Sequence, residues 1–269
     1  MSQNTMAGAS AHIELRGVDF AYTDIGSGLL VLDAHGLTSS RANNRRMGLP
    51  DFSSVTAAGR RLISYDARGH GETSGTRDPE DYTWAALAQD LLAFAERFSP
   101  DSPVSAIGSS MGTGTIINAA AGHPDRFDRL VLTAPPTAWE TRAGQADVYR
   151  IMADTVEKSD PETLSTLMSQ APIPPIFADV PGFPPTPDIK PQLQPTVFRG
   201  AGLSDLPPLE SLTTLTQPTL ILAWTGDPGH PVSTAEKLAS TLPNAELHVS
   251  DSHADLLTWG GRATAFLRR

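Results

Sequence analysis

The chain has 269 residues, 39% of them hydrophobic and 19% charged, and its 20 Lys and Arg against 30 Asp and Glu give a formal net charge of −10. This length suits one large α/β domain, or a core domain with an insertion. The acidic balance disfavours nucleic acid and anionic membrane surfaces as partners, because both require clustered Lys and Arg. The chain has no cysteine, which excludes a disulfide framework, a thiolate zinc site and a Cys nucleophile.

Two further properties bear on location. No apolar run approaches the ~20 residues of a membrane span, and residues 1–11 lack the basic and apolar segments of a signal peptide. We therefore expect a cytoplasmic protein with no membrane insertion. The main basic cluster, Arg41 with Arg45 and Arg46, is interpreted as a solvated helix face rather than a binding patch.

Strand patterns dominate the first part of the chain. Residues 12–23 alternate apolar and polar side chains across Gly17, which predicts an antiparallel hairpin at a sheet edge. Residues 29–32 form an apolar run typical of a strand buried on both faces, and it leads into a loop that contains His35 and Gly36. A glycine loop in this position can direct backbone N–H groups at a developing negative charge.

The next segment continues the alternation of strands and helices. Residues 61–65 predict a strand, and the polar turn at 66–73 is interpreted as structural despite its Asp, Arg and His. Apolar residues at helical spacing predict a helix over residues 83–98, with Thr83 as its N-cap. Residues 103–107 and 129–133 predict buried strands, and residues 113–121 predict a helix between them.

The sequence G-S-S-M-G at residues 108–112 lies between the predicted strand at 103–107 and the helix at 113–121. This is the G-x-S-x-G pattern in a strand–turn–helix context, where the central side chain is lifted above the sheet edge. The glycines two residues before and two residues after Ser110 select it, rather than Ser109, as the centre. Ser110 is the predicted nucleophile.

The strand–helix rhythm stops over residues 135–211. This segment is rich in proline but carries many apolar side chains, which is too much apolar surface for a disordered linker. It includes a helical pattern near residues 146–168. We interpret residues 135–211 as a cap inserted over the carboxyl edge of the sheet, with residues 1–134 and 212–269 forming the core.

The alternation resumes with predicted strands at 218–224 and 245–249, each followed by a helix, at 233–242 and 254–267. Asp227 lies in the loop after the first of these strands, and His253 in the loop after the second. Loops that follow parallel strands share the carboxyl edge of a sheet, where Ser110 is also expected. A serine hydroxyl needs an imidazole to take its proton and a carboxylate to orient that imidazole.

Two alternatives stay open for these roles. His230 is the second choice of base, because it is close to Asp227 but in the same loop. Glu140 is the second choice of acid. The other histidines at the turn, in the last strand and at a helix end are interpreted as structural: His70, His248 and His123.

Taken together, these motifs resemble those of the α/β-hydrolase superfamily over essentially the whole chain outside the cap. The matching features are His35-Gly36, the turn at 66–73, the elbow at 108–112, Gly226-Asp227 and His253. The resemblance implies a mostly parallel eight-stranded sheet with helices on both faces and an inserted cap. Two residues depart from the family pattern: Asp33 stands where an apolar residue is usual, and Ser252 where glycine is common.

The same resemblance implies a site. Ser110 would be the nucleophile, His253 the general acid and base, and Asp227 the residue that orients it, while the backbone N–H groups of Leu37 and Met111 would form the oxyanion hole. We further expect four residues at the substrate pocket: His35, Gly36, Trp139 and Phe177.

The expected activity is hydrolysis of a carboxylic ester or lactone of small to medium apolar character through an acyl-enzyme, with no metal or organic cofactor. A serine at the elbow argues against haloalkane dehalogenases and epoxide hydrolases, which resemble this chain but use aspartate there. The alternatives are a cofactor-free perhydrolase, a non-catalytic ligand receptor, and a C–C bond hydrolase of diketone-like ring-fission products. The last would be supported by Arg41, Arg142 or Arg199 reaching into the pocket. The oligomeric state is left open.

Overall fold

The computed structural model describes residues 8–49, 51–160 and 162–268. Within these residues, eight strands form one sheet in the order β1-β2-β4-β3-β5-β6-β7-β8. The strands are β1 (Ala11–Leu15), β2 (Val18–Gly26), β3 (Leu29–Ala34), β4 (Arg60–Tyr65), β5 (Val104–Ser109), β6 (Phe127–Thr133), β7 (Thr219–Trp224) and β8 (Ala245–Ser250). The expectation about a signal peptide concerns residues 1–11, of which residues 1–7 lie outside the described part.

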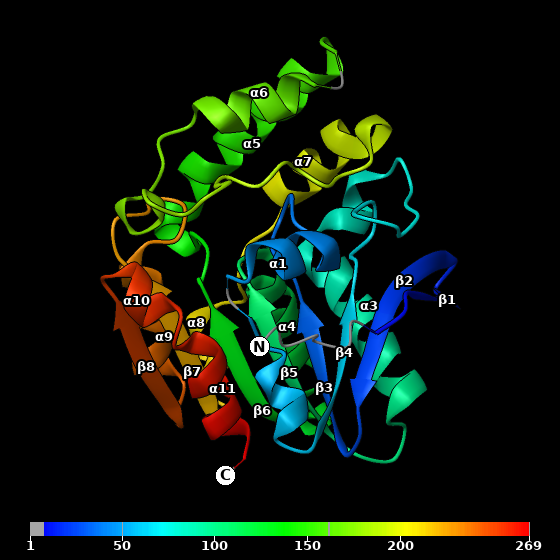
Figure 1. The fold of residues 1–269 in the computed structure, drawn as a ribbon, viewed down its shortest axis with the longest axis vertical. Helices are drawn as coiled ribbons and strands as arrows, with labels where there is room; N and C mark the ends of the chain where they lie inside the picture. Colours follow the sequence, from blue (N-terminus) through cyan, green and yellow to red (C-terminus); the bar gives the residue numbers. More distant parts are fainter. Residues whose placement is uncertain (1–7, 50, 161, 269) are drawn as a thin grey trace, which may run out of the picture.

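Strand direction follows the prediction. β1 and β2 form an antiparallel hairpin at one edge, and β2 pairs antiparallel with β4, whereas every further pair is parallel. The expected fold class, a mostly parallel eight-stranded sheet with helices on both faces, is confirmed. The carboxyl ends of the parallel strands therefore meet at one edge, which is the upper edge of the sheet in Figure 1.

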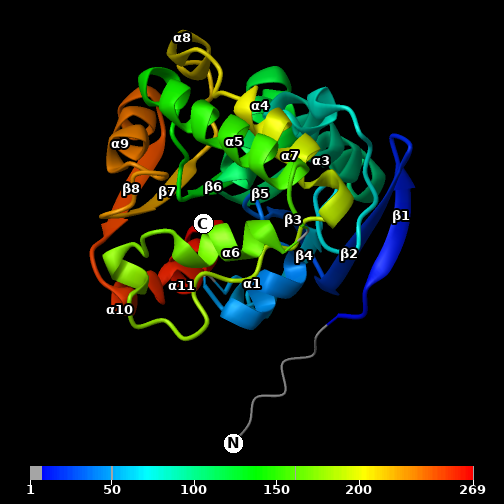
Figure 2. The same ribbon diagram turned by 90° about the horizontal axis from the view of Figure 1, so that it is seen from above.

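Helices cover both faces of this sheet (Figures 1 and 2). One face carries α3 and α4 with α9, and the opposite face carries α2 and α11. The helices outside the segment between β6 and β7 are α1 (Arg41–Met47), α2 (Ser54–Ala57), α3 (Trp84–Phe98), α4 (Met111–Gly122), α9 (Val232–Thr241), α10 (His253–Leu256) and α11 (Trp259–Leu267).

The central strands read as continuous apolar runs because both of their faces are buried. In β6, Leu130 and Leu132 pack in the cluster beneath α3 and α4, while Val131 between them packs in the cluster beneath α11. Side chains that alternate along a strand point to opposite faces of the sheet. One strand thereby contributes to two separate cores.

Helices from the segment between β6 and β7 lie above the carboxyl edge of the sheet, namely α5 (Arg142–Glu157), α6 (Thr163–Gln170) and α7 (Gln194–Gly202) (Figures 1 and 2). The short helix α8 (Leu209–Leu212) from the same segment lies lower, level with the strands in Figure 1, and its Leu212 packs in the core beneath α3 and α4. A cluster of their buried apolar residues, including Ala153, Leu164 and Phe198, packs around Tyr82. We refer to residues 135–211 as the cap segment.

Three local expectations need correction. The helical pattern at 146–168 belongs to two helices, α5 and α6, and the C-terminal pattern likewise divides into α10 and α11. Arg41 is buried instead of solvated, because its guanidinium donates to Asp66 over 3.1 Å and to Glu72 over 2.8 Å.

In the described residues no helix combines the length and apolar character needed to cross a bilayer.

Candidate active site

Ser110 stands at the junction of β5 and α4, with backbone angles φ 53° and ψ −107°. A non-glycine residue at positive φ is strained, and it persists only where its surroundings fix it. Here the Ser110 N–H donates to the carbonyl of Thr133 over 3.0 Å, and the Ser110 carbonyl accepts from Gly114 over 3.0 Å. The strand and the helix together hold the serine at the carboxyl edge of the sheet.

Two glycines make this sharp junction possible. A Cβ on Gly112 would lie 1.9 Å from the carbonyl oxygen of Ala34, and a Cβ on Gly108 would lie 2.5 Å from the backbone of Gly112. Neither distance is sterically possible for a side chain. The glycines of the G-x-S-x-G pattern thus allow α4 to pass close to both β3 and β5.

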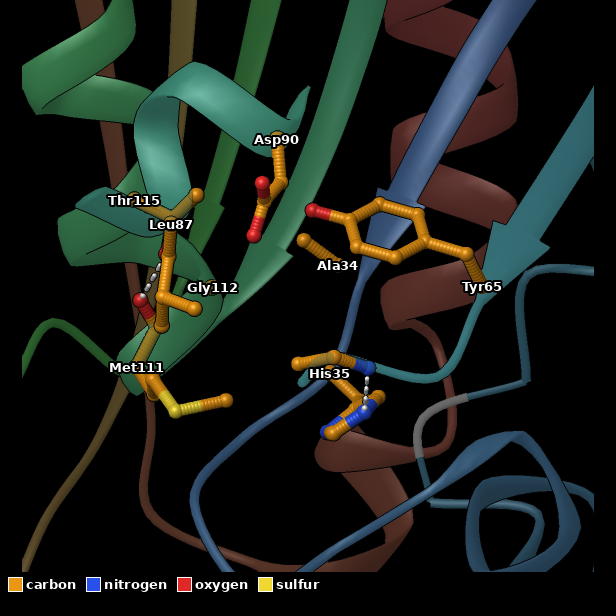
Figure 3. A pocket seen from close by; sticks show the side chains of 9 residues that line it. Ala34, His35, Tyr65, Leu87, Asp90, Met111, Gly112 and Thr115 are labelled. Carbon is orange, nitrogen blue, oxygen red and sulfur yellow. Dashed lines mark hydrogen bonds between the residues drawn. The ribbon is translucent and has the colours of Figure 1, made fainter. Parts of the chain in front are cut away.

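The loop after β3 passes directly beside the serine. A Cβ on Gly36 would lie 3.5 Å from the Cβ of Ser110. Met111 is the first residue of α4, where backbone N–H groups have no acceptor within the helix. Figure 3 shows the end of β3, with Ala34 and His35, next to Met111 and Gly112. Leu37 follows Gly36 in this loop.

His35 is buried, and both of its ring nitrogens are engaged. Nε2 accepts the N–H of Ala67 over 2.9 Å, and Nδ1 lies 2.8 Å from the carbonyl of Gly36. Burial lowers the pKa of His35, which keeps the ring neutral and Nε2 able to accept. His35 therefore holds the loop in place, and its nitrogens are not available to a substrate.

The cavity drawn in Figure 3 lies between His35, Tyr65, Asp90 and Met111. Its volume of about 10 Å³ has room for about one water molecule. It is too small to hold an ester substrate.

The imidazole that contacts the Ser110 hydroxyl is that of His230. Its Nε2 lies 2.8 Å from Ser110 Oγ, and its Nδ1 lies 2.8 Å from Asp227 Oδ2. An ionised carboxylate can only accept, so the Nδ1–H of His230 donates to Asp227 and Nε2 is left to accept the serine proton. Ser110, His230 and Asp227 form a continuous hydrogen-bonded line.

Asp227 receives three hydrogen bonds. Oδ1 accepts the N–H of Gly229 over 2.8 Å, while Oδ2 accepts from His230 and from the indole Nε1–H of Trp224 over 3.1 Å. Burial by itself would raise the pKa of Asp227, but the bonds from His230, Gly229 and Trp224 outweigh it and lower the pKa to about 2. Asp227 is therefore ionised at neutral pH.

His253 occupies a different place from the one expected. It is the first residue of α10, and in the described residues no hydrogen bond joins its side chain to Ser110 or Asp227. It lines a separate cavity of about 220 Å³ together with Gly226, Asp251 and Asp179. The physical reason is local: the turn at Pro228 and Gly229 already brings His230 onto both Asp227 and Ser110.

The alternative acid and the expected pocket aromatics also lie apart from this line. Glu140 is exposed and pairs with Lys237 Nζ at 2.8 Å. Trp139 donates its indole N–H to the carbonyl of Pro207 over 3.0 Å, so this bond lies within the cap segment. Phe177 is buried, and its ring packs edge-on against that of Trp224 with centroids 5.0 Å apart.

Trp224 was predicted only as part of a buried strand, and its hydrogen bond to Asp227 was not predicted. The chemistry of its side chain could have indicated this bond. A tryptophan at the end of a buried strand carries an indole N–H that needs an acceptor. In this sequence Asp227 lies three residues further on.

In residues 8–49, 51–160 and 162–268, no group of three or more His, Asp or Glu side chains is arranged to hold an ion. The contact between Ser110 and His230 suits proton transfer between a hydroxyl and an imidazole.

Comparison with known proteins finds a matching family model and several similar chains. A family model described as the alpha/beta hydrolase fold matches residues 30–170, a little over half of the chain. An epoxide hydrolase from Caballeronia sordidicola is 29% identical over 148 residues, which are 55% of this chain and 43% of that protein. A poly(3-hydroxyalkanoate) depolymerase from Ectopseudomonas oleovorans is 29% identical over 210 residues, covering 73% of this chain and 70% of the depolymerase.

Among solved structures, a thermophilic esterase from Thermogutta terrifontis has a TM-score of 0.75 at 22% identity, with 97% of each chain covered. That likeness concerns the fold alone. The matching family model, the sheet order and the serine elbow lead to one conclusion: this chain belongs to the α/β-hydrolase fold family.

Proposed function

We propose that this chain is a serine hydrolase that cleaves a carboxylic ester or lactone through an acyl-enzyme. The observation that carries the proposal is the line from Ser110 Oγ through His230 to Asp227, with both contacts at 2.8 Å. This arrangement gives a serine hydroxyl a base and gives that base a fixed orientation.

In the proposed reaction, Ser110 Oγ attacks the substrate carbonyl carbon while its proton passes to His230 Nε2. The N–H groups of Leu37 and Met111 stabilise the negative oxygen that forms. The bond between the carbonyl carbon and the leaving-group oxygen breaks as His230 gives the proton to the leaving-group oxygen. Water then attacks the acyl-enzyme and gives a proton to His230. The bond between Ser110 Oγ and the acyl carbon breaks, His230 returns this proton to Ser110 Oγ, and the carboxylic acid leaves. Only water and this chain's own residues are needed.

The assignment of the base departs from what the resemblance implies. His230 takes the place of His253 because it is the imidazole in contact with the nucleophile. His253 remains the alternative, since it also follows a strand at the carboxyl edge.

The relatives' names are consistent with this reaction class. One similar chain is called a depolymerase of poly(3-hydroxyalkanoate), and one similar structure is called an esterase. Another relative is called an epoxide hydrolase. Ser110 occupies the central position of the elbow, where epoxide hydrolases are expected to have an aspartate. We therefore favour ester and lactone cleavage.

An apolar acyl or ring group fits the surroundings of the oxyanion loop. Leu37 of this loop packs against the apolar core of the cap segment, and so do three half-buried side chains of α5 and α6, namely Tyr149, Met152 and Met168. We place the apolar part of the substrate against them, beneath a cap formed by residues 135–211. Apolar walls with a few polar groups are typical of small-molecule sites.

The C–C bond hydrolase is not favoured, because the three candidate cations are engaged elsewhere. Arg41 pairs with Asp66 and Glu72, and Arg199 pairs with residues of α5. Arg142 donates to backbone carbonyls of residues 201 and 204. None of these three guanidinium groups is therefore free to bind an anionic ring-fission substrate.

The test is covalent labelling with a fluorophosphonate, followed by intact-mass measurement. We expect one adduct on the wild type and on Ser109→Ala, and none on Ser110→Ala. Ser109 is the matched control because it is the neighbouring hydroxyl at the same junction. Labelled proteins are then compared with unlabelled ones on a panel of esters and lactones. An adduct on Ser110→Ala, or wild-type turnover by that variant, would contradict the proposal.

A further inference from the structure

Trp224 is the last residue of β7. Its side chain lies between Phe177 of the cap segment and His230 of the hydrogen-bonded line formed by Ser110, His230 and Asp227. Its indole Nε1–H donates to Asp227 Oδ2 over 3.1 Å. That same oxygen accepts from His230 over 2.8 Å. Trp224 is therefore bonded to the atom that orients the base.

Aromatic contacts fix the indole on three sides. Its ring lies 5.3 Å from that of His230 in an edge-on arrangement, 5.5 Å from Trp259 in a stacked one, and 5.0 Å from Phe177 in an edge-on one. Edge-on and offset-stacked pairs at these separations are favourable. A ring so enclosed has little freedom to rotate its N–H away from Asp227.

The neighbouring ring is anchored independently of the site. Trp259 is fully buried in α11, and its indole N–H donates to Ser250 Oγ over 2.9 Å. The stack thus connects the end of β8 to Trp224, and Trp224 connects it to Asp227.

We propose that Trp224 is a positioning residue for the reaction: its indole N–H and ring hold the Asp227 carboxylate and the His230 imidazole in line with Ser110. The inference rests on the proposed function. Without the indole, Oδ2 would keep His230 as its donor and Oδ1 would keep Gly229, so the carboxylate would lose one of its three hydrogen bonds and would be held less tightly in the orientation that suits His230. His230 would then spend less time aligned with the serine hydroxyl.

The chain offers a matched pair of variants. Trp224→Phe removes an indole N–H that bonds Asp227, whereas Trp259→Phe removes one that bonds Ser250. Both keep an aromatic ring in the stack. We expect the rate of fluorophosphonate labelling to fall about tenfold in Trp224→Phe and to stay within about twofold in Trp259→Phe. On an ester substrate, kcat should fall by the same factor with little change in KM, because the indole acts on alignment and not on substrate binding. Thermal unfolding of both variants reports whether either has lost its fold.

A second measurement does not depend on reactivity. Hydrogen exchange of the Trp224 indole N–H, followed by NMR, should be slow in the wild type and at least about tenfold faster in Asp227→Ala. The Trp259 indole N–H serves as the internal control, and its exchange should not change.

Three results would overturn the inference: wild-type labelling of Trp224→Phe, an equal loss in both tryptophan variants, or unchanged exchange of the Trp224 N–H in Asp227→Ala. An unreactive wild type would instead refute the proposed function. The exchange measurement would then decide alone whether Trp224 holds Asp227.

Discussion

The choice between two histidines can be decided by one pair of substitutions. His230→Ala removes both 2.8 Å contacts of the imidazole, leaving Ser110 without a base and Asp227 without its main donor. General base catalysis contributes up to about 10⁴-fold, which corresponds to ~5 kcal/mol at about 1.4 kcal/mol for each factor of ten. We expect kcat/KM of His230→Ala to fall by about this factor. His253→Ala, which changes a side chain outside the line, should stay within about threefold.

The assay is the initial rate of hydrolysis of a chromogenic ester, corrected for the reaction in the presence of Ser110→Ala. Unfolding temperatures of both histidine variants serve as the control for folding. A fall of about 10⁴-fold in His253→Ala with an active His230→Ala would refute our reasoning. The base would then be the histidine after β8, and the contact between His230 and Ser110 would belong to a resting arrangement.

Three further outcomes follow from the structure. Burial raises the pKa of Asp33 to about 6, so its ionisation opposes folding as pH rises from about 4 to 6. Asp33→Asn should therefore increase the free energy of unfolding by about 2–3 kcal/mol at pH 7 and by little at pH 3.5, as measured by denaturant titration. Gly112→Ala should cost about 3 kcal/mol or more, or prevent folding, because its Cβ would meet the carbonyl of Ala34. Gly122→Ala is the control, because Gly122 lies in the same helix and a Cβ added there would have no atom within 4 Å. It should be neutral or slightly stabilising, and thermal unfolding of both variants measures the difference. Because the pKa of Asp227 is about 2, this carboxylate stays ionised from pH 4 to pH 8. Its protonation should therefore add no step to the pH profile of kcat/KM in that range.

Local patterns predicted the features that local physics determines. The alternation of apolar runs predicted the strands, because each buried strand must present apolar side chains to both faces of the sheet. The elbow at Ser110 was predictable because its two glycines answer a steric need at fixed spacing. The eight-stranded, mostly parallel sheet was correct for these reasons.

The base was not predictable in the same way. His230 and His253 both lie in loops after strands at the carboxyl edge, so order along the chain admits either. The contact depends on how one turn folds back: the His230 N–H donates to the Asp227 carbonyl over 3.2 Å, which places the imidazole over the carboxylate. Backbone detail of this kind is not encoded in hydrophobic periodicity.

The buried arginines were missed for a related reason. Arg41 was expected to be exposed, because charged residues mostly are. In the fold its guanidinium donates hydrogen bonds to Asp66 and Glu72, which lie 25 and 31 residues away in the sequence. Arg142, expected only as a possible pocket cation, is buried and donates to the carbonyls of Ala201 in α7 and of Ser204 beyond its end. Pairings between residues distant in the chain become visible only when the elements are assembled.

The acid and the base of the proposed site are separated by two residues, Pro228 and Gly229, within one loop. Their mutual geometry is therefore an internal property of that loop, closed by bonds from Gly229 and His230 back to Asp227. The separation between His230 Nε2 and Ser110 Oγ, by contrast, joins this loop to the start of α4, 120 residues earlier in the chain. A substitution that leaves Asp227 and His230 bonded to each other can therefore still separate His230 from the serine.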